Sequence, residues 1–151
     1  MKAFRAHTTP VQVGLVSCTK AKLDHPAPPR KLYEPSALFH KARRYCEQNH
    51  DEWYVLSAKH GLLAPGGPEI EPYDETLTNA GVDERRAWAD QVADQLDAEG
   101  LLSSEIELVV HAGRAYYEYL VPHLQLEVAA VQIPTEGLAI GETLAWYDEN
   151  G

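Results

Sequence analysis

Hydrophobic residues along the chain fall into four short runs, each followed by small or polar residues. The runs cover residues 11–17, 53–57, 106–111 and 126–133. The first run is apolar at nearly every position, which is typical of a strand buried on both faces of a parallel sheet. We therefore expect four β-strands, with residues 11–17 near the centre of the structure.

Between these runs, apolar residues recur at helical spacing. The spacing predicts a helix that begins near Pro35 and Ser36 and ends around Asn49, because proline is tolerated in a first helical turn. Three further helices are expected, over residues 83–99, 113–121 and 141–149. Two segments read as loops: three prolines exclude a helix from residues 25–31, and glycines and prolines interrupt residues 61–72.

Strands and helices thus alternate along the chain without an internal repeat. This order implies right-handed crossovers and a parallel sheet covered on both faces. We expect one α/β domain over residues 1–151, with an N-terminal extension at residues 1–10. Its architecture should be a three-layer α/β/α sandwich around a mainly parallel sheet of four strands. The sequence does not predict the strand order, but all strand C-termini should meet at one edge.

Composition narrows the class of protein. The chain is 44% hydrophobic and 24% charged, as in soluble globular proteins. No apolar run approaches the ~18 residues of a transmembrane helix, and the N-terminus lacks the apolar core of a signal peptide. We expect a cytoplasmic protein without a membrane partner, whose Cys18 and Cys46 stay reduced. Cys46 falls on an apolar helix face, so we expect it in the core.

The sequence lacks the motifs of common bound groups. It contains no Cys-x-x-Cys and no His-x-x-x-His, so we expect no metal. It also contains neither a P-loop nor a dinucleotide-binding fingerprint, so we expect no ATP, NAD or other cofactor. His7, His40, His50 and His123 appear scattered, and we interpret them as surface or hydrogen-bonded histidines. The oligomeric state does not follow from the sequence.

Charge is distributed unevenly. The formal net charge is −10, yet residues 1–46 carry nine Lys and Arg against two acidic residues, or +7. The rest of the chain carries −17. A basic face on an acidic protein can attract a nucleotide or nucleic acid while the remaining surface repels it. The alternative is a solvated basic helix and loop without a partner.

Chemistry-bearing residues follow the predicted strands, at the edge where open α/β sheets bind ligands. In strand order, these candidates are Ser17, Cys18 and Lys20; Ser57, Lys59 and His60; His111, Gly113 and Arg114; and Thr135, Glu136 and Gly137. Tyr73, Asp74 and Thr76 follow the Gly/Pro-rich segment and complete the set. We expect Cys18, Lys59, Asp74 and Glu136 to face one shared hollow.

Cys18 has the most reactive setting in this set. A thiol two residues from the ammonium of Lys20 suits a nucleophile or a ligand contact, because positive charge favours the thiolate. The alternative is a small apolar core residue, since free cysteine is among the most buried residue types.

The other candidates suit ligand binding. Lys59 and His60 can bind phosphate or carboxylate, and His60 can transfer a proton near neutral pH. Asp74 and Thr76 can hydrogen-bond a base edge or sugar on which Tyr73 stacks. The alternatives are a polar loop after a strand and an ordinary turn capped by Asp74.

Two later segments add weaker candidates. Gly113 and Arg114 stand at a predicted helix N-terminus, where free N–H groups bind anions. Thr135, Glu136 and Gly137 form a short loop in which Glu136 can orient a base or a sugar hydroxyl. Each segment can also be an ordinary strand-to-helix turn.

Five motifs together resemble one known family. They are Ser17-Cys18-x-Lys20, Tyr33-x-x-Ser36-x-x-Phe39, Ser57-Ala-Lys-His-Gly-Leu62, Tyr73-Asp-x-Thr-Leu77 and Pro134-x-x-Gly137-x-x-x-Gly141. Over about residues 11–141 the chain resembles the domain-of-unknown-function family numbered 6884. It is more remotely similar to YaaA-like peroxide-stress proteins and to the lyase-like domain of archaeosine synthases.

The resemblance implies a three-layer fold of uracil-DNA-glycosylase-like or flavodoxin-like type, in a group that contacts DNA or modified tRNA. It also implies that seven residues line a pocket: Ser17, Cys18, Lys20, Ser57, Lys59, Tyr73 and Asp74.

These observations favour an enzyme acting on a nucleobase, nucleoside or nucleotide, by N-glycosidic cleavage or base modification. Its catalytic residues would be Cys18, Lys59 and Asp74, with Asp74 as general base or oxocarbenium stabiliser. One alternative is a non-catalytic, stress-related DNA- or RNA-binding protein of YaaA-like type. Another is a thiol-based redox sensor that uses Cys18.

Overall fold

A five-stranded, mostly parallel β-sheet forms the centre of the protein. The computed structural model describes residues 10–151, so nearly all of the expected extension at residues 1–10 lies outside the described part. The strands are β1 (Val11–Ser17), β2 (Glu52–Ser57), β3 (Gly61–Leu63), β4 (Ile106–His111) and β5 (Ala130–Gln132). Their order across the sheet is β3-β2-β1-β4-β5.

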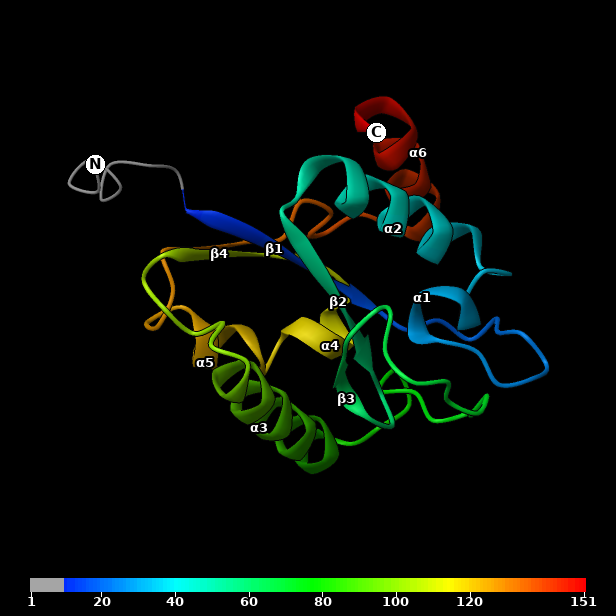
Figure 1. Cartoon of the computed structure of the whole chain (residues 1–151), viewed down its shortest axis with the longest axis horizontal. Helices are drawn as coiled ribbons and strands as arrows, with labels where there is room; N and C mark the ends of the chain where they lie inside the picture. The colour runs from blue at the N-terminus through cyan, green and yellow to red at the C-terminus, as the bar shows by residue number, and fades with distance from the viewer. Residues whose placement is uncertain (1–9) are drawn as a thin grey trace.

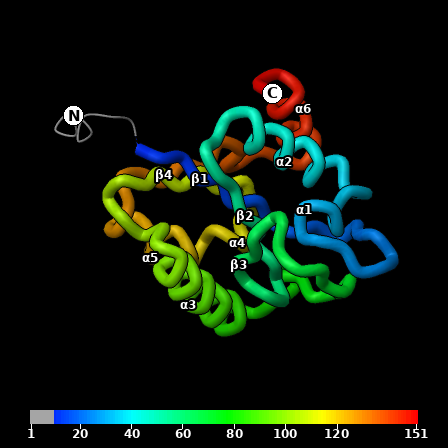
Figure 2. Tube along the Cα trace, in the orientation of Figure 1, coloured from blue at the N-terminus to red at the C-terminus, as the bar shows by residue number. Residues whose placement is uncertain are grey.

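Helices cover both faces of this sheet (Figure 1). The helices are α1 (Pro29–Leu32), α2 (Ala37–Asn49), α3 (Val82–Ala98), α4 (Arg114–Tyr117), α5 (Val121–Leu124) and α6 (Ile140–Asn150). On one face α2 packs against α6, while α3 packs against α4 and α5 on the other. The C-terminal helix therefore lies beside the first long helix, as the chain trace also shows (Figure 2). The expected α/β class is confirmed.

Strand β1 occupies the middle of the sheet. It pairs in parallel with β2 on one side and with β4 on the other, and its residues Val13 to Val16 are buried. In the register, Ser17 lies beside Leu56 of β2, and Val16 lies beside His111 of β4. The C-terminal ends of the three strands therefore meet at one edge, as the alternation of elements predicts.

The chain crosses from β1 to β2 through α2 and returns through α3 to β4 on the other side of β1. The direction of the connections reverses between β1 and β4, and open α/β sheets bind ligands at such a reversal, beyond the strand C-termini. The topology thus favours a ligand site at the segments that follow Ser17 and His111.

The expected four-stranded sheet is wrong in one respect. Residues 61–63 form β3, which pairs antiparallel with β2 through a tight hairpin. Gly61 enters this strand with φ of +76°, a left-handed conformation that glycine adopts without strain. The strand therefore extends the sheet inside a segment that the glycines and prolines marked as a loop.

Three helix and strand boundaries also differ from expectation. The proline-rich loop overlaps α1. Pro29 lies in the first turn of this helix, where a backbone N–H would have no intrahelical hydrogen-bond partner. The helix expected over residues 113–121 is two short turns, α4 and α5, and Pro122 lies in the first turn of α5. The fourth strand shrinks to Ala130–Gln132, since Leu126 is 92% exposed and has no sheet to enter.

Within residues 10–151, no helix has the length and apolar character needed to cross a membrane.

Candidate functional site

Two neighbouring cavities lie at the C-terminal end of β1. The larger has a volume of about 730 Å³, and the smaller about 130 Å³. Thr19, Leu38 and Ile140 line both of them. A volume between roughly 300 and 1,000 Å³ is typical of small-molecule sites, so the larger cavity has room for a ligand.

The larger cavity is lined by five segments that are far apart in the sequence. These are the residues directly after β1, the start of α2 through Ser36 and Leu38, the loop at residues 74–79, α4 through Tyr116, and the start of α6 through Ile140. Four of the predicted site residues line it: Cys18, Lys20, Asp74 and Thr76. Lys22 and Glu75 also line it, and sequence reasoning did not select either of them.

Cys18 lies at the buried end of this cavity. The residue is only 6% exposed, and its backbone N–H extends the β1–β2 ladder to Leu56. The backbone N–H of Ala58 donates to its Sγ at 3.3 Å. The Tyr116 hydroxyl lies 3.4 Å from the same sulfur.

In the contact between Cys18 Sγ and the Tyr116 hydroxyl, either atom can be the donor. The Tyr116 oxygen also accepts a hydrogen bond from the N–H of Leu77 at 3.5 Å, and burial raises the pKa of Tyr116. The Cys18 sulfur thus has two polar neighbours, and one of them is a backbone N–H donor.

Lys22 is held at the cavity by aromatic rings. Its Nζ lies 4.5 Å from the centre of the Tyr73 ring and 5.8 Å from that of Tyr33. Ammonium groups are attracted to the negative faces of such rings. Tyr73, which we expected to stack on a base, therefore stacks against a lysine that lines the cavity.

Behind the cavity wall, Ser57, Tyr73 and Tyr33 form a buried polar chain. The Ser57 hydroxyl donates to the Tyr73 hydroxyl at 2.7 Å, and the two tyrosine hydroxyls lie 2.5 Å apart. Burial raises the pKa of both tyrosines. Ser57 Oγ also accepts the backbone N–H groups of Lys59 and His60. Ser57 and Tyr73 therefore hold the turn after β2, and neither residue lines the larger cavity.

The smaller cavity lies between the ends of β1 and β4. Four predicted site residues line it: Ser17, His111, Gly113 and Thr135. Tyr147 lines it as well, and its hydroxyl is 2.8 Å from His111 Nδ1. The predicted candidates are therefore divided between two adjacent spaces rather than one.

Besides Ser57 and Tyr73, five candidates lie outside both linings. Lys59, Arg114, Glu136 and Gly137 line neither cavity, and His60 is half-buried beside the Tyr73 ring. Arg114 pairs with Glu118 one turn later, and Gly137 has φ of +82°, which shapes the turn. Burial, followed by the nearby Lys59 charge, lowers the pKa of His60. Of the four residues expected to share one hollow, Cys18 and Asp74 line the larger cavity, and Lys59 and Glu136 do not.

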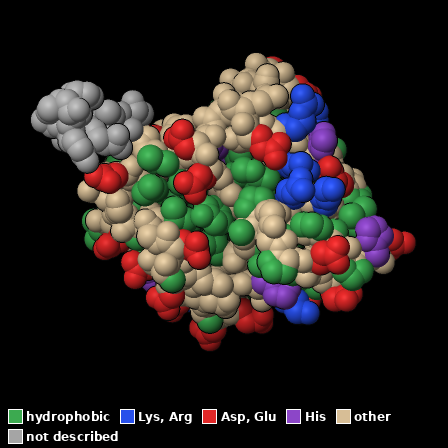
Figure 3. Space-filling model, viewed as in Figure 1, with side chains coloured by type: hydrophobic (Ala, Val, Ile, Leu, Met, Phe, Trp, Pro, Cys, Tyr) green, Lys and Arg blue, Asp and Glu red, His purple; other side chains and the backbone are tan. Residues whose placement is uncertain are grey.

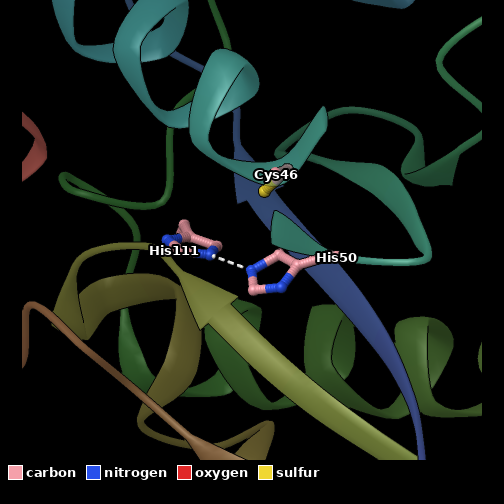
Figure 4. Close-up of side chains that lie close together, drawn as sticks. All are labelled: Cys46, His50 and His111. Atoms are coloured by element: carbon pink, nitrogen blue, oxygen red, sulfur yellow. Dashed lines mark hydrogen bonds between the residues drawn. The ribbon is translucent and has the colours of Figure 1, made fainter. Parts of the chain in front are cut away.

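Sequence reasoning overlooked a second cluster, formed by Cys46, His50 and His111 (Figure 4). Their sulfur and nitrogen atoms lie within 4.8 Å of one another, which makes them a candidate metal-binding group among the described residues. A signal was present in the sequence, because Cys46 precedes His50 by four positions, and such residues share one side of a helix. His111 comes from a distant strand, which spacing alone does not reveal.

Among the comparisons with known proteins, one shows the family, and none names an activity. The uncharacterized protein YfjM of Bacillus subtilis (strain 168) is 39% identical over 83 residues, which cover 54% of this chain and 53% of that protein. The match thus spans about half the length of each protein. No solved structure gives a significant match. A family model described as a family of unknown function (DUF6884) matches residues 13–149, and the chain belongs to this family.

Proposed function

We propose that the protein is an enzyme that acts on a nucleobase, nucleoside or nucleotide in the larger cavity. The observation that carries the proposal is the convergence of a thiol, two ammonium groups and a carboxylate on one space, through Cys18, Lys20, Lys22 and Asp74. A phosphate can pair with the lysines, while the carboxylate and the Thr76 hydroxyl suit the polar edges of a base or sugar.

The proposed reaction class is N-glycosidic cleavage or base modification, and the groups that line the cavity support it. In N-glycosidic cleavage, water adds to C1′ of the sugar while the bond to the base breaks, and the base leaves with a proton. Asp74 can take the proton from water or stabilise the positive charge that develops on the sugar. Cys18 contacts the base or serves as a nucleophile in base modification. Lys59, which lies outside the cavity lining, has no role in this proposal.

The expected likeness to YaaA-like proteins, and to uracil-DNA-glycosylase-like or flavodoxin-like folds, belongs to the same proposal. It rests on the motifs in the sequence and on the position of the cavity beyond the strand ends. A cytoplasmic location is likewise part of the proposal.

The test is a substrate panel with matched variants. Nucleosides, nucleotides and modified oligonucleotides are incubated with the protein, and products are separated and identified by mass spectrometry. Cys18→Ala, Lys20→Ala and Asp74→Asn should each lower turnover or ligand affinity at least about tenfold. Lys31→Ala and Asp97→Asn make the same charge changes at exposed positions on α1 and α3, and they should leave both quantities unchanged. Equal effects in the two sets of variants would contradict the proposal.

Nucleic-acid binding is a second candidate, favoured by one surface feature. Lys and Arg side chains gather over α1 and α2, while acidic side chains predominate along the edge formed by α3 (Figure 3). Ion pairs reduce this basic charge, because Arg43 contacts Glu34 and Glu47, and Lys41 contacts Asp148. Affinity for DNA and RNA should be measured over a salt series, because the logarithm of the affinity for phosphates falls linearly with the logarithm of the salt concentration. Affinity independent of salt would exclude this candidate.

A further inference from the structure

Cys46, His50 and His111 meet between the sheet and the α2/α6 layer. Cys46 lies on the last turn of α2, His50 is the residue that caps this helix, and His111 ends β4. Cys46 and His111 are buried, at 1% and 4% exposure. Their sulfur and ring nitrogens face a common centre, together with those of His50 (Figure 4).

The backbone of β1 leaves room for this group. Gly14 lies directly beneath it, and a Cβ at that position would be 2.7 Å from Cys46 Sγ and 2.8 Å from His50 Cδ2. Glycine in the interior of a strand weakens the strand and often marks a close approach. At Gly14 the missing side chain lets a thiol and an imidazole lie against the central strand.

Both imidazoles are oriented by hydrogen bonds at their outer nitrogens. His50 Nδ1 lies 3.2 Å from Gln12 Oε1, and the Gln12 amide nitrogen donates to Glu107. The amide oxygen therefore faces the ring, so Nδ1 carries the proton and Nε2 presents its lone pair to the centre. Histidines that bind metals are held by outer partners in the same way.

The second imidazole needs only a change of tautomer. His111 Nδ1 lies 2.8 Å from the Tyr147 hydroxyl, and the two Nε2 atoms lie 3.0 Å apart. Without a metal, His111 Nε2–H donates to His50, and the tyrosine donates to His111 Nδ1. With a metal on Nε2, His111 Nδ1–H donates to the tyrosine oxygen instead. The hydroxyl serves in both states because it can donate or accept.

The spacing of the donor atoms is close to that of a bound ion. Tetrahedral zinc, with its usual bond lengths to nitrogen and sulfur, separates two nitrogens by about 3.3 Å and a nitrogen from a sulfur by about 3.6 Å. The two nitrogens are 3.0 Å apart, and all three atoms lie within 4.8 Å of one another. Side-chain adjustments of about 1 Å suffice to seat an ion.

We propose that Cys46, His50 and His111 form a binding site for a transition-metal ion of the zinc type. The set of one thiolate and two imidazoles suits zinc, and calcium and magnesium prefer oxygen ligands. Three protein ligands leave a fourth position for water, and the smaller cavity adjoins the site at His111.

The protonation states agree with this assignment. Burial, followed by the nearby His50, lowers the pKa of His111 to about 3, and burial also lowers the pKa of His50. Both rings are therefore neutral at pH 7, as metal ligands must be. Burial raises the pKa of Cys46, so metal binding must displace the thiol proton into solvent.

The experiment measures metal binding by the full chain produced without a histidine tag. After chelator treatment and dialysis, the protein is titrated with Co²⁺ as a spectroscopic probe and with Zn²⁺ in competition with a chromophoric chelator. We expect one equivalent to bind, with a thiolate-to-cobalt absorption band. Cys18→Ser should keep this band, and Cys46→Ser should lose it. His50→Gln and His111→Gln should each weaken Zn²⁺ affinity at least about 100-fold.

A positioning variant separates ligation from structural support. Gln12→Ala removes the partner of His50 Nδ1 while keeping all three ligands, and it should lower Zn²⁺ affinity by about 10- to 100-fold. Circular dichroism identifies any variant that fails to fold, and in that event the comparison of wild type with Cys18→Ser and Gln12→Ala decides the matter. Failure of the folded wild-type protein to bind one equivalent would overturn the proposal, as would a thiolate band that depends on Cys18. The cluster would then be a neutral, hydrogen-bonded histidine pair beside a buried thiol.

Discussion

Replacing Ser57 by alanine tests whether this residue supports the fold or contacts a ligand. Its side chain is fully buried, and its hydroxyl makes three hydrogen bonds: one donated to Tyr73 and two accepted from the N–H groups of Lys59 and His60. The substitution removes the hydroxyl with almost no change in shape. Each bond contributes about 1 kcal/mol, so Ser57→Ala should lower the free energy of unfolding by about 2–3 kcal/mol.

The assay is urea denaturation of Ser57→Ala, Tyr73→Phe and the double variant. Because the two hydroxyls bond directly, the double variant should lose less stability than the sum of the single losses, by about 1 kcal/mol. Ser104→Ala is the matched control, since Ser104 is exposed, and its effect should remain within about 0.5 kcal/mol.

The outcome also separates two roles for Ser57. The bonds from Ser57 fix the turn that directs the Ala58 N–H at Cys18 Sγ, so Ser57→Ala should also change the rate at which the Cys18 thiol is alkylated. A loss of ligand affinity with unchanged stability would instead show that Ser57 binds substrate, and it would refute a supporting role for its hydroxyl.

Three further predictions concern other parts of the structure. Gly14→Ala should destabilise the fold by about 1–3 kcal/mol, because the added Cβ would approach Cys46 and His50 closer than atoms normally pack. Gly113→Ala is the control, since Gly113 has open space around it, and equal urea midpoints for the two variants would contradict the crowding at Gly14. Ser36 caps α2 through its Oγ, which accepts the N–H of Phe39, so Ser36→Ala should cost about 1 kcal/mol and Ser36→Gly only a few tenths in thermal or urea unfolding; the reverse order would refute the cap. Burial raises the pKa of Tyr33, Tyr73, Tyr116 and Tyr147 above the ordinary value near 10. Above that pH the unfolded chain releases protons that the folded chain retains, so stability should fall as pH rises; ultraviolet titration should show these four tyrosines ionising only on unfolding, and early ionisation of all eight would contradict their burial.

The sequence predicted the elements whose hydrophobic pattern is strong. β1 and β4 are mostly apolar runs because both faces of the sheet are covered there, and α2 and α3 carry apolar residues at helical spacing. The failures lie where the local pattern is weak. Strand β3 has three residues and depends on its partner β2, while β5 pairs over only three residues at the edge of the sheet. Pairing of this kind is a tertiary effect that no short window of sequence contains.

The candidate site, too, was predicted from the sequence only in part. Parallel topology places the C-terminal ends of the parallel strands at one edge of the sheet, so the sequence could place Ser17 and Cys18 at that edge. It could not show which way each side chain points. Tyr73 turns inward to Ser57 and Tyr33, whereas Asp74, the next residue, lines the cavity. Tyr73 and Asp74 are adjacent in the sequence, but the tyrosine hydroxyl lies in the buried polar chain and the carboxylate lines the cavity.

The two cysteines have opposite surroundings, and this makes the two proposals separable. The Cys18 sulfur accepts a hydrogen bond from the Ala58 N–H and contacts the Tyr116 hydroxyl at the end of an open cavity, while the Cys46 sulfur is buried against two imidazoles. His111 belongs to the second group and also lines the smaller cavity, which shares Thr19, Leu38 and Ile140 with the larger one. If the sites are independent, Cys46→Ser abolishes the thiolate–metal band and leaves ligand binding in the larger cavity intact. If Cys46→Ser abolishes both in a folded protein, the shared wall transmits the metal's effect, and the two sites act as one.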